Sequence, residues 1–458
     1  MRKILFCIAI LVLSAANSFA ATHYIRPSGS GCAGAGTSFT NCYNGIPGTL
    51  TRGDTYVIAG GDYGSYAFND SGTSLITIRK ANATQDSGVS GWSASYGTDQ
   101  AVFSGTGTNV WNFTQGYYYI DGVTGSGSGT GADYGFKVTY TNSSTAINPG
   151  IVTVNSNMTI RNVWFLGFAQ SGMANVAVHG IREEYESNLT IEYNLVENFT
   201  YGVDTAGSSQ VIYQHNYFKG GYGPGCCHQD YIRMGFGMVA DNRVFRFNTF
   251  DDVVDGGYTG VFVCVGSYTT YPSAHCNDTE IYGNIFINVN GGGNGTFTTS
   301  NSSSSGALPC NDWLIYNNTF VGGATTVHFF YNYSGNLFKN NLLYNSNGYL
   351  AGATADYNYF NSSTAIGSNQ VVSSESTSVL FDDYAGGDYH LGSTDSDAYA
   401  AGTDLGDSYD EDPDGVDRDP NWSMGAYEYG TNTITGVTIG NLQTIEALIS
   451  WNRSDGLR

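Results

Sequence analysis

Charge is scarce in this chain of 458 residues, and most of it has one sign. Only 12% of the residues are charged, and 17 lysines and arginines stand against 39 aspartates and glutamates, for a net charge of −22. A chain this acidic repels nucleic acids and anionic membranes, so neither is expected as a partner. The same charge argues against a very highly charged anionic glycan, unless calcium or a local basic patch intervenes.

Long apolar runs are also missing after the N-terminus. No stretch beyond residue 20 is long enough to span a membrane as a helix. Residues 1–20 have the organisation of an export signal, with a basic start, an apolar run too short to span, and a small-residue cleavage site. These parts are Arg2 and Lys3, the run from Ile4 to Leu13, and Ser18-Phe19-Ala20 before Ala21. We therefore expect a protein that is secreted or held at the cell surface, without membrane insertion after the signal is cleaved.

Cysteine is limited to eight residues, and Cys7 lies in the signal, which leaves seven in the exported chain. In an exported protein these are expected to form disulfides. Two pairs that bracket short loops are predicted to be bonded, namely Cys32 with Cys42 and Cys264 with Cys276.

The remaining cysteines leave more than one pairing open. Cys310 could bond Cys226 or Cys227 across a coil, with one thiol left over. A metal site at Cys226-Cys227-His228 is the alternative, which is disfavoured because adjacent cysteines rarely form a zinc site.

Helical periodicity is missing as well, and a ladder of short alternating apolar segments takes its place from about Asn157 to Phe360. Most segments close on Asn, any residue, then an apolar residue, and the closing asparagines recur at intervals of 17 to 36 residues. Similar segments at such periods predict a solenoid of short parallel strands, with neighbours about 4.8 Å apart. The asparagines from residue 194 onward are Asn194, Asn216, Asn248, Asn284, Asn318, Asn341 and Asn358.

The repeated asparagine is predicted to be structural. A side-chain amide at the same turn of successive coils can bond the amides above and below it. The phenylalanine two positions later then fills the core at the same level.

These segments resemble those of the right-handed parallel β-helix proteins, the superfamily typified by pectate lyases. Arg52 to Tyr63 is similar to the family segment that begins the first coil, and Asp388-Tyr389-His390-Leu391 with Gly425-Ala426-Tyr427-Glu428-Tyr429 resembles a closing segment of exported bacterial members. The resemblance implies an all-β fold, a single right-handed parallel β-helix with an N-terminal cap. This scaffold carries lyases, hydrolases, epimerases and non-catalytic surface proteins, so it does not decide activity.

The expected organisation is one domain after the signal. Residues 21–429 form the β-helix, with the cap and first turn at 21–60 and the closing segment at 388–429. The stretch from Thr37 to Leu50 is expected to hold a short capping helix, and Glu428 is expected to be structural. The tail 430–458 has no assigned role, and a monomer is expected.

One group of ionisable residues stands out in a chain so poor in charge. Strand alternation sends Arg182, Asp204 and Arg233 outward in one column when the strands that follow each corner are aligned. His228 and Asp230 lie at the start of the last of these strands, and His179 at the start of the first. The superposed segments are Gly180-Ile181-Arg182, Gly202-Val203-Asp204, Tyr231-Ile232-Arg233 and Gly260-Val261-Phe262.

This group suits chemistry on a uronic-acid sugar. A β-elimination needs a base for the proton beside the carboxylate and positive charge for the enolate, and Arg or His can supply both. A hydrolysis needs two carboxylates, for which Asp204 and Asp230 are present. A surface column of ion pairs without activity is the structural alternative.

Resemblance adds a preference among these functions. His228-Gln229-Asp230-Tyr231-Ile232 resembles a segment at active-site coils of some glycan-active β-helices, whereas the paired-Asp and Gly-His-Gly signatures of polygalacturonases are missing. Lysines are few, which disfavours a lysine base, although Lys137, Lys219 and Lys339 are present. The sequence thus favours a polysaccharide lyase, with a glycoside hydrolase and a non-catalytic glycan-binding protein left open.

Two acidic segments are candidates for calcium. Asp410, Asp412 and Asp414 alternate before Gly415, as at the start of a calcium loop, but the twelfth position is Asn421, so any affinity should be weak. A solvated acidic loop is the alternative. A second group, Asp251, Asp252 and Asp255, could bind calcium or simply contact Lys219 one coil below.

Overall fold

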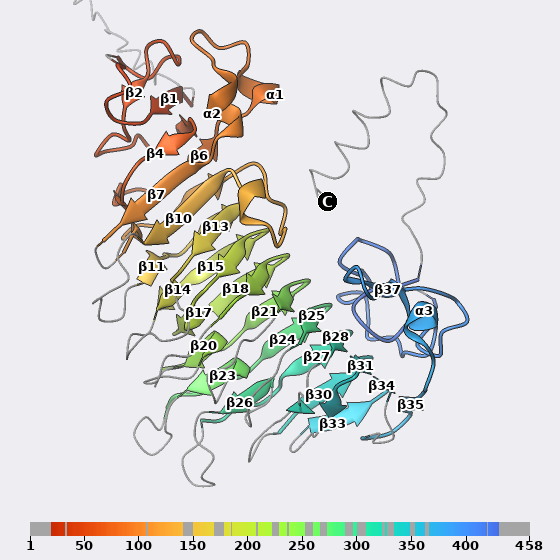
Figure 1. Cartoon of the computed structure of the whole chain (residues 1–458). Coiled ribbons are helices and arrows are strands. Elements are labelled where there is room, and N and C mark those ends of the chain that lie inside the picture. Colours follow the sequence, from red (N-terminus) through yellow and green to blue (C-terminus); the bar gives the residue numbers. More distant parts are fainter. Residues whose placement is uncertain are drawn as a thin grey trace, which may run out of the picture.

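The structure, a computed structural model, describes residues 20–429 apart from short gaps. The described chain winds as a right-handed parallel β-helix whose coils contribute strands to three long parallel sheets (Figure 1). The predicted fold class is confirmed. Residues 1–19 and the tail 430–458 lie outside the described residues. The internal gaps are residues 33, 107–108, 141–149, 169–177, 185, 208, 222–228, 236–237, 252–259, 266–272, 289–295, 300–307, 323–325, 328–333, 349–352, 362–365 and 419.

Sheet A has 13 strands and extends along the whole solenoid. Its strands are, in sheet order, β2 (Tyr43–Asn44), β1 (Thr22–Arg26), β3 (Thr55–Ile58), β6 (Ile76–Lys80), β9 (Tyr118–Asp121), β12 (Met158–Arg161), β15 (Ser187–Glu192), β18 (Ser209–Gln214), β21 (Arg243–Arg246), β24 (Thr279–Tyr282), β27 (Leu314–Tyr316), β30 (Asn336–Lys339) and β33 (Ala353–Asp356).

Sheet B follows sheet A within each coil and has 12 strands. They are β4 (Gly61–Asp62), β7 (Ala101–Gly105), β10 (Phe136–Tyr140), β13 (Val163–Leu166), β16 (Leu195–Glu197), β19 (Tyr217–Lys219), β22 (Thr249–Asp251), β25 (Ile285–Ile287), β28 (Thr319–Val321), β31 (Leu342–Tyr344), β34 (Tyr359–Phe360) and β35 (Val371–Val372).

Sheet C completes the coil with eight strands. They are β5 (Tyr66–Phe68), β8 (Trp111–Phe113), β11 (Gly150–Thr153), β14 (His179–Glu184), β17 (Tyr201–Ala206), β20 (Asp230–Gly235), β23 (Gly260–Val265) and β26 (Phe297–Thr299). The other described elements are the parallel pair β29 (Thr326–Val327) and β32 (Asn347–Gly348), the antiparallel pair β36 (Phe381–Asp383) and β37 (Asp388–Leu391), and the helices α1 (Ala83–Asp86), α2 (Ala94–Thr98), η1 (Gly131–Asp133) and α3 (Thr377–Leu380).

The predicted asparagine ladder runs through the interior at the corner between sheets A and B. Asn216 is 1% exposed, and its Nδ2 donates to Asn248 Oδ1 at 3.0 Å and to the backbone oxygen of Ile191 at 2.8 Å. The same pattern joins all seven asparagines from Asn194 to Asn358. Each amide therefore satisfies backbone groups that the turn would otherwise leave buried without partners.

The phenylalanines beside this ladder stack as expected. Phe218, Phe250, Phe286 and Phe320 lie 4.6 to 5.1 Å apart between ring centroids, with interplanar angles of 11° or less. Burial of such a ring contributes about 1.5–3 kcal/mol. Asn162 does not belong to the ladder. Arg161 pairs with Glu192 in the sheet register, so Asn162 lies level with Tyr193 and not with the ladder residue Asn194.

Replacing Asn248 by alanine is expected to destabilise the protein by about 1–3 kcal/mol, because the amides of Asn216 and Asn284 would lose their partner. Asn69→Ala, at an exposed position of the N-terminal part, is the matched control and should change stability by less than about 0.5 kcal/mol. Equilibrium denaturant unfolding measures both. Equal midpoints for the two variants would contradict the structural role of the ladder.

The N-terminal cap differs from the prediction. No helix lies between Thr37 and Leu50, a stretch that is fully described and contains only β2. Helices α1 and α2 lie instead at residues 83–98, where Asn82 Oδ1 caps α1 by accepting from the Gln85 backbone nitrogen at 3.0 Å. Beneath them Phe39, Val57, Ala59 and Ala81 form a small separate core, so the cap extends well beyond residue 60.

The closing segment lies along the side of the solenoid, next to sheet B (Figure 1). Its Tyr389, Leu391 and Met424, together with Leu380 and Phe381 just before it, pack in one cluster with residues of β25, β28 and β31. Within the described residues, no helix is both long and apolar enough to cross a membrane.

Candidate active site

Sheet C departs from simple alternation at the strands that carry the predicted site. In β20, Tyr231 and Ile232 both belong to the main core although they are consecutive, and the same holds for Val261 and Phe262 in β23. Two inward residues in succession leave the residues on both sides, such as Asp230 and Arg233, facing outward.

The equivalent inward positions in β14 and β17 are glycines. A Cβ at Gly180 would meet the backbone oxygen of Gly202 at 2.3 Å, so position 180 of β14 requires glycine, although the same corner carries Tyr231 in β20.

The outward residues form two columns. The first is the predicted one, since Arg182 pairs with Asp204 and Asp204 with Arg233 in the sheet register. The second, on the other side of the inward pair, aligns His179 with Tyr201 and Tyr201 with Asp230. We call these six residues the sheet C cluster.

The alignment of the next coil was wrong by one residue. Ile232 pairs with Phe262 and Arg233 with Val263, rather than Ile232 with Val261. Gly260 takes the position of Asp230, because β23 also places two consecutive residues in the core.

The contacts within the cluster tie the two columns together. His179 Nδ1 lies 3.0 Å from Asp204 Oδ2, and the Arg233 guanidinium lies over the Tyr201 ring at 4.3 Å. Burial raises the pKa of Asp204, but His179, Arg233 and Arg182 together hold it below its ordinary value. Burial also raises the pKa of Tyr201, to about 12, although Arg233 opposes the rise.

The side chains of the sheet C cluster are less exposed than their outward positions on the strands led us to expect. Asp204 and Arg233 are each 8% exposed, and His179 and Asp230 are buried as well, while Arg182 is half-buried. In such an environment charge–charge interactions are stronger than at an open surface. Arg233 therefore contributes to packing through Tyr201 as well as offering charge, so its removal lowers stability too.

Some of the other candidate residues lie outside the described residues, and others have partners in the structure. His228, Asp252, Asp255, Cys226 and Cys227 lie outside the described residues. Lys219 lies level with Asp251 in the sheet register, as expected, but the contacts of the two side chains go to other residues. Asp251 accepts from the Tyr217 hydroxyl at 2.6 Å, and Lys219 Nζ lies 3.6 Å from Glu197.

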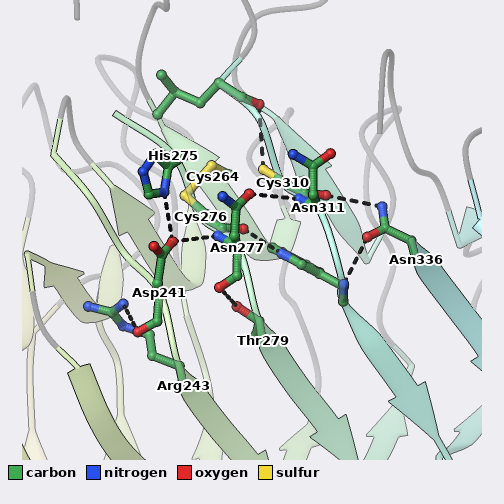
Figure 2. The surroundings of a disulfide bond; sticks show 12 residues. Asp241, Arg243, Cys264, His275, Cys276, Asn277, Thr279, Cys310, Asn311 and Asn336 are labelled. Atoms are coloured by element: carbon green, nitrogen blue, oxygen red, sulfur yellow. Dashed lines mark hydrogen bonds and ion pairs between the residues drawn. A yellow bond between two sulfur atoms is a disulfide. The ribbon is translucent and has the colours of Figure 1, made fainter. Parts of the chain in front are cut away.

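Both predicted disulfides are present, Cys32–Cys42 and Cys264–Cys276. Cys310 is buried beside the second, with the three sulfur atoms within 4.8 Å of one another (Figure 2). Figure 2 also shows a second ladder at this corner, where Asp241 Oδ1 accepts from the Asn277 backbone nitrogen and Asn277 Oδ1 accepts from that of Asn311.

Sequence reasoning missed a polar group inside the coil. Glu183 is fully buried and pairs with the equally buried Arg243, whose Nη2 lies 3.4 Å from Glu183 Oε1. Alternation alone could have placed Glu183 inward, because it directly follows the outward Arg182.

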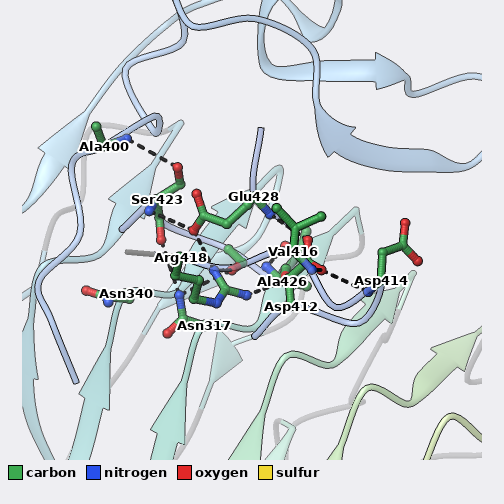
Figure 3. A network of polar contacts seen from close by, with 12 residues as sticks. Asn317, Asn340, Ala400, Asp412, Asp414, Val416, Arg418, Ser423, Ala426 and Glu428 are labelled. Carbon is green, nitrogen blue, oxygen red and sulfur yellow. Dashed lines mark hydrogen bonds and ion pairs between the residues drawn. The ribbon is translucent and has the colours of Figure 1, made fainter. Parts of the chain in front are cut away.

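Two aspartates of the C-terminal loop, Asp412 and Asp414, have structural partners (Figure 3). Asp412 is 1% exposed; its Oδ1 accepts from the backbone nitrogens of Asp414 and Val416, and its Oδ2 from that of Glu428. Asp414 Oδ2 lies 2.9 Å from His390 Nε2. Among the described residues, the carboxylates of Asp410, Asp412 and Asp414 do not gather within 4.8 Å of one another.

No family model and no curated protein matches the chain. Nine solved chains match it in structure. Pectate lyase Pel9A has a TM-score of 0.45 and 12% identity, over 90% of this chain and 97% of that one. An alginate lyase from Paenibacillus sp. str. FPU-7 has a TM-score of 0.33 and 14% identity, over 71% and 99%.

The tailspike protein gp49 from Acinetobacter baumannii bacteriophage Fri1, a capsular polysaccharide depolymerase, has a TM-score of 0.33 and 10% identity, over 70% of this chain and 56% of that one.

Proposed function

We propose that the chain is an exported enzyme that cleaves a uronic-acid-containing polysaccharide by β-elimination at the sheet C cluster. The observation that supports this is the joining of two arginines, a histidine and two aspartates on the outer face of three neighbouring strands. Such a gathering of ionisable side chains stands out in a chain with only 12% charged residues.

The residues divide into two roles. Arg182 and Arg233 would bind the uronate carboxylate through their planar guanidinium groups and stabilise the negative charge of the enolate. His179 is held at Nδ1 by Asp204, so its Nε2 would take the proton beside the carboxylate. Asp204 orients the ring and stabilises the imidazolium that forms.

Hydrolysis by Asp204 and Asp230 fits the cluster less well. A glycoside hydrolase needs one carboxyl group that stays protonated at working pH, which requires a raised pKa. The pKa of Asp204 is lowered instead, by His179 and the two arginines acting against burial. Asp204 is thus suited to orienting a base rather than to donating a proton.

Digestion of a panel of uronic-acid and neutral glycans tests the proposal. The wild type should release ultraviolet-absorbing unsaturated products together with reducing ends. Arg233→Lys keeps the charge but not the planar fork, and is expected to lower turnover by about 10²–10³-fold.

Arg246→Ala removes an arginine from the outer face of sheet A and should keep the activity. Thermal unfolding of each variant separates lost activity from lost folding. Reducing ends without unsaturated products would indicate a hydrolase, and no release from any glycan a binding protein; either result overturns the lyase.

Calcium binding at Asp410, Asp412 and Asp414 stays a hypothesis. The variant that tests it must leave the structural contacts of Asp412 intact. Asp412→Ala would remove three backbone contacts whether or not an ion binds. Asp410→Asn is the cleaner variant. If calcium binds there, a chelator lowers the melting temperature of the wild type and leaves that of Asp410→Asn unchanged. A wild type that does not respond to the chelator contradicts the site.

A further inference from the structure

The first described residues are tied to a buried carboxylate. The backbone nitrogen of Ala21 donates to Asp54 Oδ1 at 2.9 Å, and His23 Nε2 lies 2.9 Å from Asp54 Oδ2. Asp54 is 6% exposed, whereas Ala21 itself is exposed. Both carboxylate oxygens are thus occupied by groups from the beginning of the chain described.

Ala21 is held on its other side as well. Its carbonyl oxygen accepts from the Thr55 backbone nitrogen at 2.8 Å, at the point where β1 pairs with β3. The Tyr56 ring stacks on His23 at 4.9 Å, and the Tyr43 ring lies 5.5 Å from His23 on the other strand that pairs with β1. These contacts fix the position of the Ala21 nitrogen independently of any electrostatic attraction to the Asp54 carboxylate.

We propose that the bond between Ala20 and Ala21 is a processing site, and that the α-ammonium group it releases is bound by Asp54. Two independent observations meet at one atom. The sequence Ser18-Phe19-Ala20 predicts cleavage before Ala21, and the nitrogen that this cleavage would free is the one that contacts the buried carboxylate. This inference does not rest on the proposed activity.

The chemistry of the step is a peptide hydrolysis by a signal peptidase. Water breaks the Ala20–Ala21 bond, the carbonyl carbon of Ala20 takes the hydroxyl group, and the nitrogen of Ala21 takes the proton. The new amine has an ordinary pKa of about 7.7–8.0 and is protonated again at neutral pH. One neutral N–H donor is replaced by a cation with three, next to a carboxylate that solvent screens little, so the contact becomes a charge-assisted hydrogen bond.

The test uses the full-length chain, expressed with its own N-terminus in a bacterium that exports it. Intact mass and N-terminal sequencing of the exported protein should show Ala21 as the first residue. The rate at which an activated ester acylates the α-amine at pH 7 is then compared between the wild type and Asp54→Asn. An opposite charge this close raises an amine pKa by about one unit or more, so the wild type should react about tenfold more slowly.

Two controls separate charge from folding. Asp62→Asn removes an exposed carboxylate of the same cap and should leave the rate unchanged. A chain that begins at Ala20 moves the amine one residue away from Asp54, and it should react as fast as Asp54→Asn even if that variant folds poorly. A first residue other than Ala21, or equal rates for the wild type, Asp54→Asn and the chain from Ala20, overturns the proposal.

Discussion

A chain in which methionine replaces Arg243 is expected to lose about 3–5 kcal/mol of unfolding free energy. Arg243 and Glu183 are both fully buried inside the coil. Glu183 also accepts from the hydroxyl groups of Tyr213, at 3.1 Å, and Thr205, while Arg243 Nε donates to Thr205 Oγ1 at 2.7 Å. Removing the arginine leaves a carboxylate in the core, and no other cation among the described residues compensates its lost hydration.

The size of this loss should depend on pH. Burial raises the pKa of Glu183 above its ordinary 4.5, and Arg243 opposes that rise. Without Arg243 the folded-state pKa rises further above the unfolded one. A carboxyl group with a raised folded-state pKa contributes stability below its unfolded pKa, and this contribution is lost as the pH rises through the folded pKa. The deficit of Arg243→Met should therefore be larger at pH 8 than at pH 5.

Denaturant unfolding of the single variant and of a double variant measures the effect. Combining Arg243→Met with Glu183→Leu removes both charges, and such replacements of a buried pair are often neutral or stabilising. The double variant should recover most of the lost stability and lose the added pH dependence. A single variant as stable as the wild type at both pH values would show that the pair is not enclosed.

The parts of the fold that sequence alone could predict depend on repetition. Asn216, Asn248 and Asn284 recur at one corner and must satisfy the same backbone groups, so their spacing reveals the coil. The register of Arg182 with Asp204 and Arg233 follows from the same alignment, because one buried face fixes the register.

Sequence reasoning failed in sheet C, where the strands depart from the regular alternation of inward and outward residues. Tyr231 and Ile232 are both apolar and both inward, and alternation gives no signal for two inward residues in succession. For this reason His179, Tyr201 and Asp230 could not be placed level with one another beside the arginine column. The enclosure of Arg233 was likewise missed, because burial on an outer face depends on segments distant in the sequence.

The position of the closing segment did leave a signal in the sequence. Ile285, Val321, Leu342 and Tyr344 are apolar residues on sheet B that pack with the closing segment instead of with the main core. Apolar outward positions in successive coils require a cover, since a solvated face would carry polar residues. From these positions, the prediction of a closing segment at residues 388–429 could have been extended to say that the segment covers sheet B.

Replacing Arg418 by methionine is expected to release this segment without unfolding the rest. Arg418 is 1% exposed, and its Nη1 lies 2.8 Å from Glu428 Oε1 (Figure 3). The same carboxylate accepts from the Ser423 nitrogen, and Ala426 donates to Thr319 Oγ1 on β28 at 2.8 Å. Breaking the pair should weaken docking of the segment by about 3–5 kcal/mol.

In a solenoid each coil contacts only its neighbours, so this loss should stay local. Hydrogen exchange of Arg418→Met should be faster across residues 388–429 and unchanged in β14, β17 and β20, and the activity proposed for the sheet C cluster should survive. Arg79→Met, which breaks the ion pair with Asp86 at the other end of the molecule, is the matched control and should loosen only the cap around α1. Breaking one ion pair should increase exchange only in the segment that this pair holds in place. Faster exchange throughout the solenoid in either variant would therefore show that the solenoid unfolds as one cooperative unit.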